Sequence, residues 1–224
     1  MNKIAIGTTA LLVGAAAASA DIRITEYMYG ATNGGSSTGV NFEFFEITNF
    51  GAAPVDLTGW SIDDNSRVPG SQSLTGLGIL AIGESAVITE ATDAAFRARW
   101  GLAASVKVLG GNVNNFSRAD EMNVYDASNV LIDRLTYDDQ TQAGTTRTQG
   151  VSAWRYRSLG GGVYGNADAT WVKSVVGDAQ TSWKAISPAN ADDVGSPGVY
   201  VAPAPGSIAL IGLAGLVAGR RRRA

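Results

Sequence analysis

Apolar and polar residues alternate along the middle of the chain in short runs that are rich in β-branched and aromatic side chains. Such alternation over roughly four to eight residues predicts a strand with one buried face. These runs lie at residues 22–27, 42–48, 60–62, 86–89, 106–109, 122–125 and 130–137, and residues 126–129 read as a hairpin turn. Short strands at this spacing predict an all-β sandwich.

Residues 93–100 differ from these strands and predict one short helix. Thr92 stands at the N-cap position, where its hydroxyl can accept a hydrogen bond from a backbone amide of the first turn. Phe96 and Trp100 are four residues apart and therefore lie on one side of the helix.

Alternation also assigns faces to two glutamates. In the first predicted strand it places Ile22 and Ile24 on one face, together with Glu26 if the alternation continues. In the second strand, Glu46 lies opposite its apolar neighbours. Both carboxylates should point inward or to an edge, where hydrogen bonding to backbone amides of a neighbouring loop is the favoured role. The alternative is a catalytic pair for glycoside hydrolysis, which needs carboxyl groups about 5–10 Å apart.

The first twenty residues are typical of a secretory signal peptide. Lys3 supplies the positive charge, residues 4–18 are apolar or small, and Ala18-Ser19-Ala20 is an A-x-A cleavage site before Asp21. A buried N-terminal strand or helix is the alternative, but five alanines at residues 15–20 support it poorly. We therefore expect cleavage between Ala20 and Asp21 and a mature protein outside the cytoplasm.

The C-terminal residues 201–224 combine three features in a fixed order. A Pro203-Ala204-Pro205 motif precedes an apolar run at residues 206–219, and the chain ends on a basic cluster that would stay on the cytoplasmic side, formed by Arg220, Arg221, Arg222 and Arg223. This tail resembles the PEP-CTERM sorting signal of exported bacterial proteins, although Ala204 stands where that family usually has Glu. The resemblance implies processing by an exosortase-type enzyme.

The alternative for this tail is a permanent single-span anchor. As a helix, residues 206–219 would cover about 21 Å, which is less than the roughly 30 Å of a hydrocarbon core. The short run and its prolines favour a C-terminal hydrophobic sorting helix that is inserted transiently and then removed.

Between these ends, residues 21–200 are predicted to form one domain, because the chain shows neither an internal repeat nor an internal linker. The whole chain has 17 basic and 20 acidic residues; without Lys3 and the four terminal arginines, 12 basic residues remain and the net charge becomes −8. This acidic charge argues against nucleic acid as a partner, since basic residues supply most of the affinity for phosphates. The chain has no cysteine, so no disulfide contributes to stability.

Residues 22–137 carry a second resemblance. An opening Ile-x-Glu strand is followed by Phe-Glu-Phe-Phe-Glu-Ile-Thr-Asn at 42–49, by Pro-Val-Asp-Leu-Thr-Gly-Trp at 54–60 and by a turn and strand at 80–88. This order resembles the lamin-tail domain, although Ile82 stands where proline is usual. Gly195-Ser196-Pro197-Gly198 resembles the closing segment of bacterial members.

The resemblance implies an immunoglobulin-like β-sandwich that other proteins use as a non-catalytic interaction or accessory module. Leu57 and Trp60 flank a Thr-Gly corner and can bury large apolar areas, and Trp60 is the best single candidate for the core.

The chain offers little catalytic chemistry. It contains no histidine and no cysteine, which excludes Ser-His-Asp and Cys-His sites and nearly all zinc hydrolase sites. Carboxylates in loops can bind calcium. The weak candidates for calcium ligands are Asp63 and Asp64, with further acidic pairs at 138–139 and 192–193. None has the spacing of a known calcium loop, so surface turns are favoured, and we expect no cofactor and no catalytic residue.

Aromatic residues gather late in the chain. They could form a stacking platform for sugars, but filling of the core is favoured because a sandwich of this size needs aromatic side chains inside; the residues are Trp154, Tyr156, Tyr164, Trp171 and Trp183.

The sequence therefore predicts an exported bacterial protein that passes transiently through the inner membrane to the cell surface or extracellular matrix. Its expected role is structural or adhesive. Signal peptidase and an exosortase-type enzyme would process it, and extracellular polysaccharide or other envelope proteins would be its partners. The alternatives are a carbohydrate-binding module and a carboxylate-dependent, polysaccharide-active enzyme.

Overall fold

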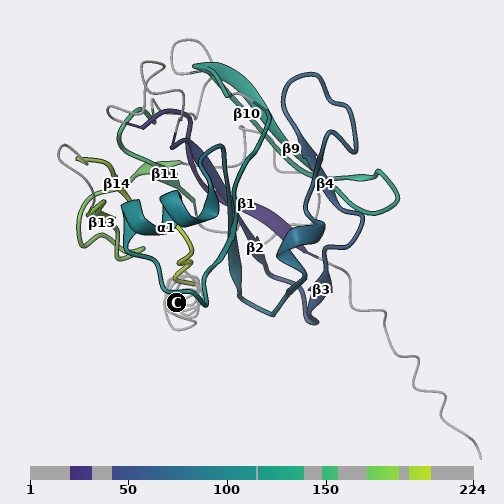
Figure 1. Ribbon diagram of the computed structural model, residues 1–224, viewed down its shortest axis with the longest axis horizontal. Helices are drawn as coiled ribbons and strands as arrows, with labels where there is room; N and C mark the ends of the chain where they lie inside the picture. The colour runs from purple at the N-terminus through teal and green to yellow at the C-terminus, as the bar shows by residue number, and fades with distance from the viewer. Residues whose placement is uncertain are drawn as a thin grey trace, which may run out of the picture.

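Two β-sheets form the body of the protein (Figure 1). The structure is a computed structural model and describes residues 21–31, 42–114, 116–138, 148–155, 171–186 and 192–202. The larger sheet contains, in spatial order, β12 (Val172–Lys173), β11 (Ala153–Trp154), β1 (Ile22–Met28), β2 (Phe44–Asn49), β7 (Ser85–Thr89) and β8 (Lys107–Leu109). The smaller sheet contains β10 (Leu131–Asp138), β9 (Ala119–Tyr125), β4 (Ser61–Asp63) and β5 (Gln72–Ser73).

The ladders between the strands of the described residues are antiparallel except that of β7 with β8, which is parallel. Two isolated bridges, Gly30 with Gln149 and Val151 with Val194, are also parallel. Two small ribbons complete the fold, one of β3 (Val55–Asp56) with β6 (Ile79–Leu80) and one of β13 (Trp183–Lys184) with β14 (Val194–Gly195). A short 3₁₀ helix at Thr75–Leu77 precedes β6. The predicted all-β fold is confirmed.

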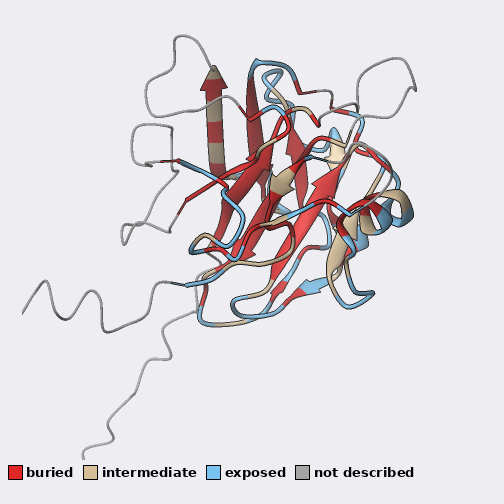
Figure 2. Ribbon diagram, turned by 90° about the vertical axis from the view of Figure 1, so that its left-hand side faces the viewer, coloured by how far each residue is buried: buried red, intermediate tan, exposed pale blue. Residues whose placement is uncertain are grey.

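The main hydrophobic core lies between the two sheets. Ile24 and Ile88 from the larger sheet meet Val124 and Leu135 from the smaller one, and all four are completely buried. Trp60 belongs to the same core, as predicted. Figure 2 shows that most strand residues of both sheets are buried.

A second, smaller core lies on the other face of the larger sheet, beneath helix α1 (Asp93–Trp100). Phe44 of β2 contacts both aromatic residues of the helix, with ring centroids 5.4 Å from Phe96 and 5.9 Å from Trp100. The larger sheet is therefore covered on both faces, whereas alternation alone suggests one buried face per strand.

The helix begins and ends as its sequence predicts. The Thr92 hydroxyl accepts a hydrogen bond from the Ala95 amide (3.2 Å). Gly101 ends the helix in the left-handed conformation at φ 66°, where glycine carries no steric penalty.

The assignment of Glu26 to the face of Ile22 and Ile24 is wrong. The pairing of β1 with β2 shifts register between Ile24 and Glu26, which marks a β-bulge. One extra residue turns the following side chains over. Tyr27 consequently joins Ile22 and Ile24 in the main core, and Glu26 faces the opposite side.

The segments after residue 147 extend the larger sheet. β11 pairs with β1, and β12 pairs with β11. These strands have only two residues each, as have β3, β5, β6, β13 and β14, which is too short for the alternation that predicts a strand. No helix in the described ranges is long and apolar enough to cross a membrane, and the predicted tail at 203–224 lies outside them.

Candidate functional site

Glu26 and Glu46 occupy directly opposed positions on β1 and β2, on the face of the larger sheet away from the main core. Each is only 1% exposed. The bulge in β1 produces this arrangement, because without it Glu26 would point into the space between the sheets.

Glu26 is surrounded by hydroxyl and amide donors. Its Oε1 accepts hydrogen bonds from the Ser196 amide (2.8 Å) and the Ser152 hydroxyl (2.5 Å), and its Oε2 accepts one from the Ser196 hydroxyl (2.9 Å). The Ser152 hydroxyl also contacts that of Ser174 (2.7 Å). Gly195 lies so close that a Cβ atom there would be 2.9 Å from Glu26 Oε1.

Glu46 has a similar set of partners. Its Oε2 accepts a hydrogen bond from the Gly198 amide (2.8 Å), and its Oε1 accepts one from the Thr25 hydroxyl (2.5 Å). The hydroxyl of Thr25 continues to Thr48 (2.9 Å), and that of Thr48 continues to Ser85 (2.7 Å). A chain of hydroxyl groups therefore leads away from Glu46 along β1, β2 and β7.

Burial changes the acidity of both groups. Loss of hydration raises the pKa of Glu26 from 4.5 to about 7, although its hydrogen bonds from Ser152 and Ser196 act in the opposite direction. Loss of hydration and the neighbouring carboxylate of Glu26 raise the pKa of Glu46 from 4.5 to about 8.

These contacts confirm the favoured role of the pair as acceptors for backbone amides of a loop. The loop is the Gly195-Ser196-Pro197-Gly198 segment, and it supplies an amide to each glutamate. A glycoside hydrolase pair would instead flank a bound sugar. Here both carboxylates are buried and engaged by their own chain, which is the arrangement of a structural anchor.

A surface hollow of about 300 Å³ lies beside this anchor. It is lined by Gly83, Glu84, Ser85, Ser105, Val106, Gly198, Val199 and Tyr200. Ser85, the last hydroxyl of the chain from Glu46, thus reaches the hollow, and Gly198 separates Glu46 from it.

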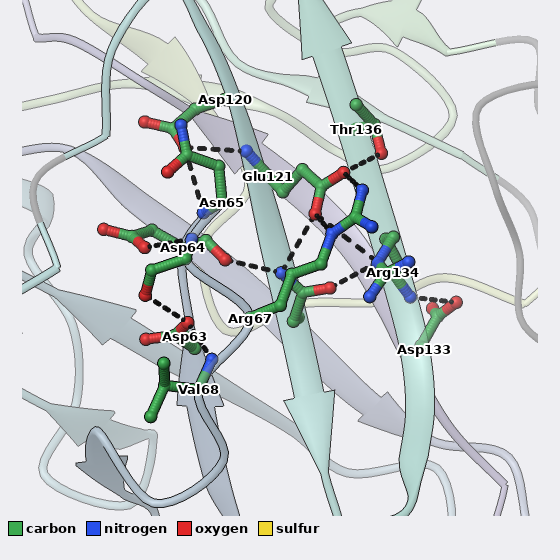
Figure 3. Close-up of polar contacts among 12 residues, drawn as sticks. Asp63, Asp64, Asn65, Arg67, Val68, Asp120, Glu121, Asp133, Arg134 and Thr136 are labelled. Atoms are coloured by element: carbon green, nitrogen blue, oxygen red, sulfur yellow. Dashed lines mark hydrogen bonds and ion pairs between the residues drawn. The ribbon is translucent and has the colours of Figure 1, made fainter.

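The calcium candidates Asp63 and Asp64 close a turn (Figure 3). Asp63 is buried, and its Oδ2 accepts hydrogen bonds from the Val68 amide (2.6 Å) and the Ser66 hydroxyl (2.8 Å). Asp64 Oδ1 accepts one from the Ser66 amide (2.8 Å). The expected turn is present, but Asp63 is not on the surface, because β4 carries it beneath the loop that follows.

An ion-pair network lies next to this turn, on the side of β9 and β10 away from the core (Figure 3). Arg67 binds Glu121 through two nitrogens, at 2.8 Å and 2.6 Å, and the Thr136 hydroxyl donates to the same carboxylate (3.0 Å). The Arg67 guanidinium lowers the pKa of Glu121. No local pattern predicts this network, because Glu121 lies 54 residues from Arg67 along the chain and Thr136 lies further still.

The two residues of the acidic pair at 192–193 each bind a different basic side chain. Asp193 pairs with Arg99 (2.5 Å), and Asp192 pairs with Lys184 (3.3 Å). Asp138 ends β10, and residue 139 lies outside the described residues. Within the described ranges, no three acidic, histidine or cysteine side chains come together as a metal site.

The late aromatic residues divide into two groups. Trp154 and Trp171 are each 6% exposed, which confirms core filling for both. Trp183 is half-buried and packs edge-on against Trp100 at 6.0 Å. Tyr156 and Tyr164 lie outside the described residues.

Of the predicted targeting residues, Asp21 alone belongs to the described part of the chain. Ala20, the Pro203-Ala204-Pro205 motif and the four terminal arginines lie outside the described residues. Asp21 is the first described residue, and its carboxylate pairs with Arg23 (2.6 Å).

Comparison with known families identifies the sandwich. The family model of the Lamin Tail Domain matches residues 15–139, more than half of the chain. The chain belongs to the lamin-tail domain family. A search of curated proteins found no match.

The lamin-tail match ends one residue after β10. It therefore includes β1 and β2, and thus both glutamates, but not the segment that supplies their amide donors. In this protein, residues 148–202 add β11 to β14 and the closing segment to the matched lamin-tail region.

Proposed function

We propose that this protein is an exported structural or adhesive component of the bacterial envelope or extracellular matrix, in which the lamin-tail domain makes contacts and carries out no reaction. This proposal rests on the hydrogen bonds that the carboxylates of Glu26 and Glu46 accept. Their carboxylates hold the chain's own backbone at Ser196 and Gly198. Membership of the lamin-tail family, which is typical of structural modules, supports the same role.

Export and processing are proposed from the sequence of the two ends. The A-x-A site before Asp21 supports cleavage by signal peptidase. The Pro203-Ala204-Pro205 motif, the short apolar run and the arginine cluster support removal of the tail by an exosortase-type enzyme at the inner membrane. Extracellular polysaccharide or other envelope proteins are the proposed partners.

Mass spectrometry of the protein from an exosortase-containing bacterium tests this proposal. We expect a mature chain that begins at Asp21 and lacks residues 206–224, and a heavier chain in cells without the exosortase. Replacing the four terminal arginines by glutamine should also leave the tail in place. An identical mass with and without the exosortase would contradict the processing step.

An enzymatic role is tested separately. Purified wild-type protein should release no reducing ends from the matrix polysaccharide of the producing strain. If it does release them, and if folded Glu26→Gln and Glu46→Gln variants have lost this activity, the protein is a polysaccharide-active enzyme and the structural proposal is wrong.

A further inference from the structure

The C-terminal part of the described chain, residues 195–202, lies against the larger sheet through a small set of contacts. Its amides at Ser196 and Gly198 donate to the two buried glutamates. Near the end of this segment, the Val201 amide donates to Gln180 Oε1 (2.7 Å), and Gln180 Nε2 donates to the Val201 carbonyl (3.0 Å). Tyr200 packs edge-on against Phe50 with ring centroids 4.8 Å apart. We call residues 195–202 the latch.

The residues just before the latch are fixed in a different way. The Asp193 carboxylate is completely buried and pairs with Arg99, and the Val194 amide donates to the carbonyl of Gly150 (3.0 Å). An arginine stays charged at any physiological pH. Residues 193 and 194 are thus a firm base for the latch.

On each glutamate, one oxygen accepts an amide of the latch and the other contacts a hydroxyl group; Glu26 Oε1 also accepts the Ser152 hydroxyl (2.5 Å). One oxygen accepts a backbone amide and must remain an acceptor, namely Glu26 Oε1 from Ser196 and Glu46 Oε2 from Gly198. The other oxygen contacts hydroxyl groups, from Ser196 at Glu26 Oε2 and from Thr25 at Glu46 Oε1. A hydroxyl can turn from donor to acceptor. Both carboxyls can therefore carry a proton without losing the amide of the latch.

The surroundings of the pair give it no positive partner. In the described part of the chain, the hydrogen-bond donors to both carboxylates are neutral hydroxyl and amide groups. Asp178, which accepts from Trp154, adds negative charge near Glu26. Of the other charged groups on the surrounding elements, Arg99 pairs with Asp193, Lys107 with Glu84 (4.0 Å) and Lys184 with Asp192. Lys173 on β12 is exposed.

Protons also have a route to the pair. The hydroxyl chain from Glu46 through Thr25 and Thr48 ends at Ser85, which lines the surface hollow. A buried carboxyl connected to the surface in this way can follow the pH of the medium.

We propose that residues 195–202 are a pH-sensitive latch, which is docked while Glu26 and Glu46 hold protons and is released from the sheet when both are ionised. Two opposed, buried negative charges without a cation repel each other, and hydration of both requires the covering segment to leave. The inference goes beyond the proposed function, because it concerns the folded domain and does not depend on export or processing.

The direction of the effect follows from proton linkage. Both carboxyls bind a proton more tightly when the latch is docked, since the pKa of Glu26 rises to about 7 and that of Glu46 to about 8. The two protonated glutamates therefore stabilise the docked latch fully below pH 4.5, the ordinary pKa of a glutamate. This stabilisation decreases as the pH rises from there through about 7 to 8.

Amide hydrogen exchange on the full chain tests the proposal. Protection factors, corrected for the intrinsic pH dependence of exchange, should fall by about tenfold or more at Ser196 and Gly198 between pH 5.5 and pH 8.5. The amide of Val194, which does not contact a carboxylate, should keep its protection. Equal protection of Ser196 and Gly198 at both pH values would overturn the proposal.

Two variants assign the effect to the pair. The double variant Glu26→Gln and Glu46→Gln keeps one acceptor for each latch amide and removes the ionisation, so its protection should not change with pH. Glu43→Gln is the matched control, because Glu43 is another buried glutamate of raised pKa (about 8), and its Oε1 accepts the Phe116 amide instead of the latch. Its latch should respond as in the wild type. A pH response that survives in the double variant, or disappears in Glu43→Gln, would also overturn the proposal.

A direct measurement remains available if the double variant does not fold. Carbon-13 titration of the wild-type glutamate carboxyls should show Glu26 and Glu46 ionising above the ordinary value of 4.5, together with the loss of latch protection. Ionisation of both near 4.5 would contradict the proposed mechanism.

Discussion

Asp133 shows how one buried charge supports an irregular backbone. Its Oδ2 accepts hydrogen bonds from the Ile24 amide (2.9 Å) and from Arg155 (3.0 Å), and Arg155 in turn donates to the Ile24 carbonyl (3.0 Å). Ile24 lies at the bulge of β1, where regular pairing with β2 is interrupted. The Asp133–Arg155 pair thus binds both backbone groups of Ile24, next to the bulge.

We expect Asp133→Asn to reduce the free energy of unfolding by about 3 kcal/mol, because it leaves the Arg155 charge buried without its carboxylate. Urea denaturation at neutral pH measures this change. Lys184→Gln is the control, since its ion pair with Asp192 joins side chains that are 61% and 78% exposed. A loss of similar size in both variants would show that the buried pair has no special importance.

At the scale of elements, the closing segment depends on glycine where the chain passes closest to its neighbours. Gly198 has φ +82°, and a Cβ atom there would be 2.3 Å from Val106 Cγ1. Gly70 has a similar φ of +88° with nothing within 4 Å of the added carbon. The two positions therefore separate backbone strain from steric overlap.

Gly70→Ala should cost about 1 kcal/mol of stability through backbone strain alone. Gly198→Ala should cost about 2–4 kcal/mol, because overlap with Val106 is added to the strain. Urea denaturation compares the two costs, and hydrogen exchange should show that only Gly198→Ala exposes residues 195–202. Equal costs and an intact latch in both variants would mean that Val106 moves aside freely.

Helix α1 covers the second core and depends on its N-cap. Thr92→Ala should reduce the free energy of unfolding by about 1 kcal/mol, because the Ala95 amide loses its acceptor. Thr92→Ser keeps that acceptor and should stay close to the wild type. Thermal unfolding followed by circular dichroism distinguishes the two variants, and a stable Thr92→Ala would show that burial of Phe96 and Trp100 alone holds the helix.

At the scale of the whole molecule, stability should depend on pH in an uncommon direction. Burial raises the pKa of Glu26 to about 7 and those of Glu43 and Glu46 to about 8, so the folded state binds protons that the unfolded state has lost. Stability from these groups is complete below 4.5 and is lost as the pH rises through 7 to 8. The pKa of Glu121 is lowered, so its contribution to stability is lost at acidic pH, as the pH falls and its carboxylate takes up a proton.

We therefore expect a maximum of stability near pH 5, with the free energy of unfolding lower at pH 8.5 by more than about 1.4 kcal/mol, the equivalent of one pKa unit. Urea denaturation across this range measures the change. Glu43→Gln should reduce the slope between pH 5 and 8.5 without abolishing it. Stability that rises steadily from pH 5 to pH 8.5 would show that the three glutamates are ionised in the folded protein.

The longer strands and the helix could be predicted because their patterns are local. Alternation over β1, β2 and β10 and the spacing of Phe96 and Trp100 are visible in a few consecutive residues. The two-residue strands β11 and β12 could not be found in this way. β11 is a strand because the edge of β1 offers it backbone partners, and β12 is a strand because β11 does the same for it.

By itself, the sequence determined that this is an all-β lamin-tail domain with one helix and without histidine or cysteine chemistry, because residue types and local periodicity are sufficient for those conclusions. Only the tertiary structure decided which way Glu26 points and what it holds. A one-residue bulge reverses the face of a strand, and Ser196 approaches Glu26 across 170 positions of sequence. Such contacts depend on how distant segments pack, which no local pattern records.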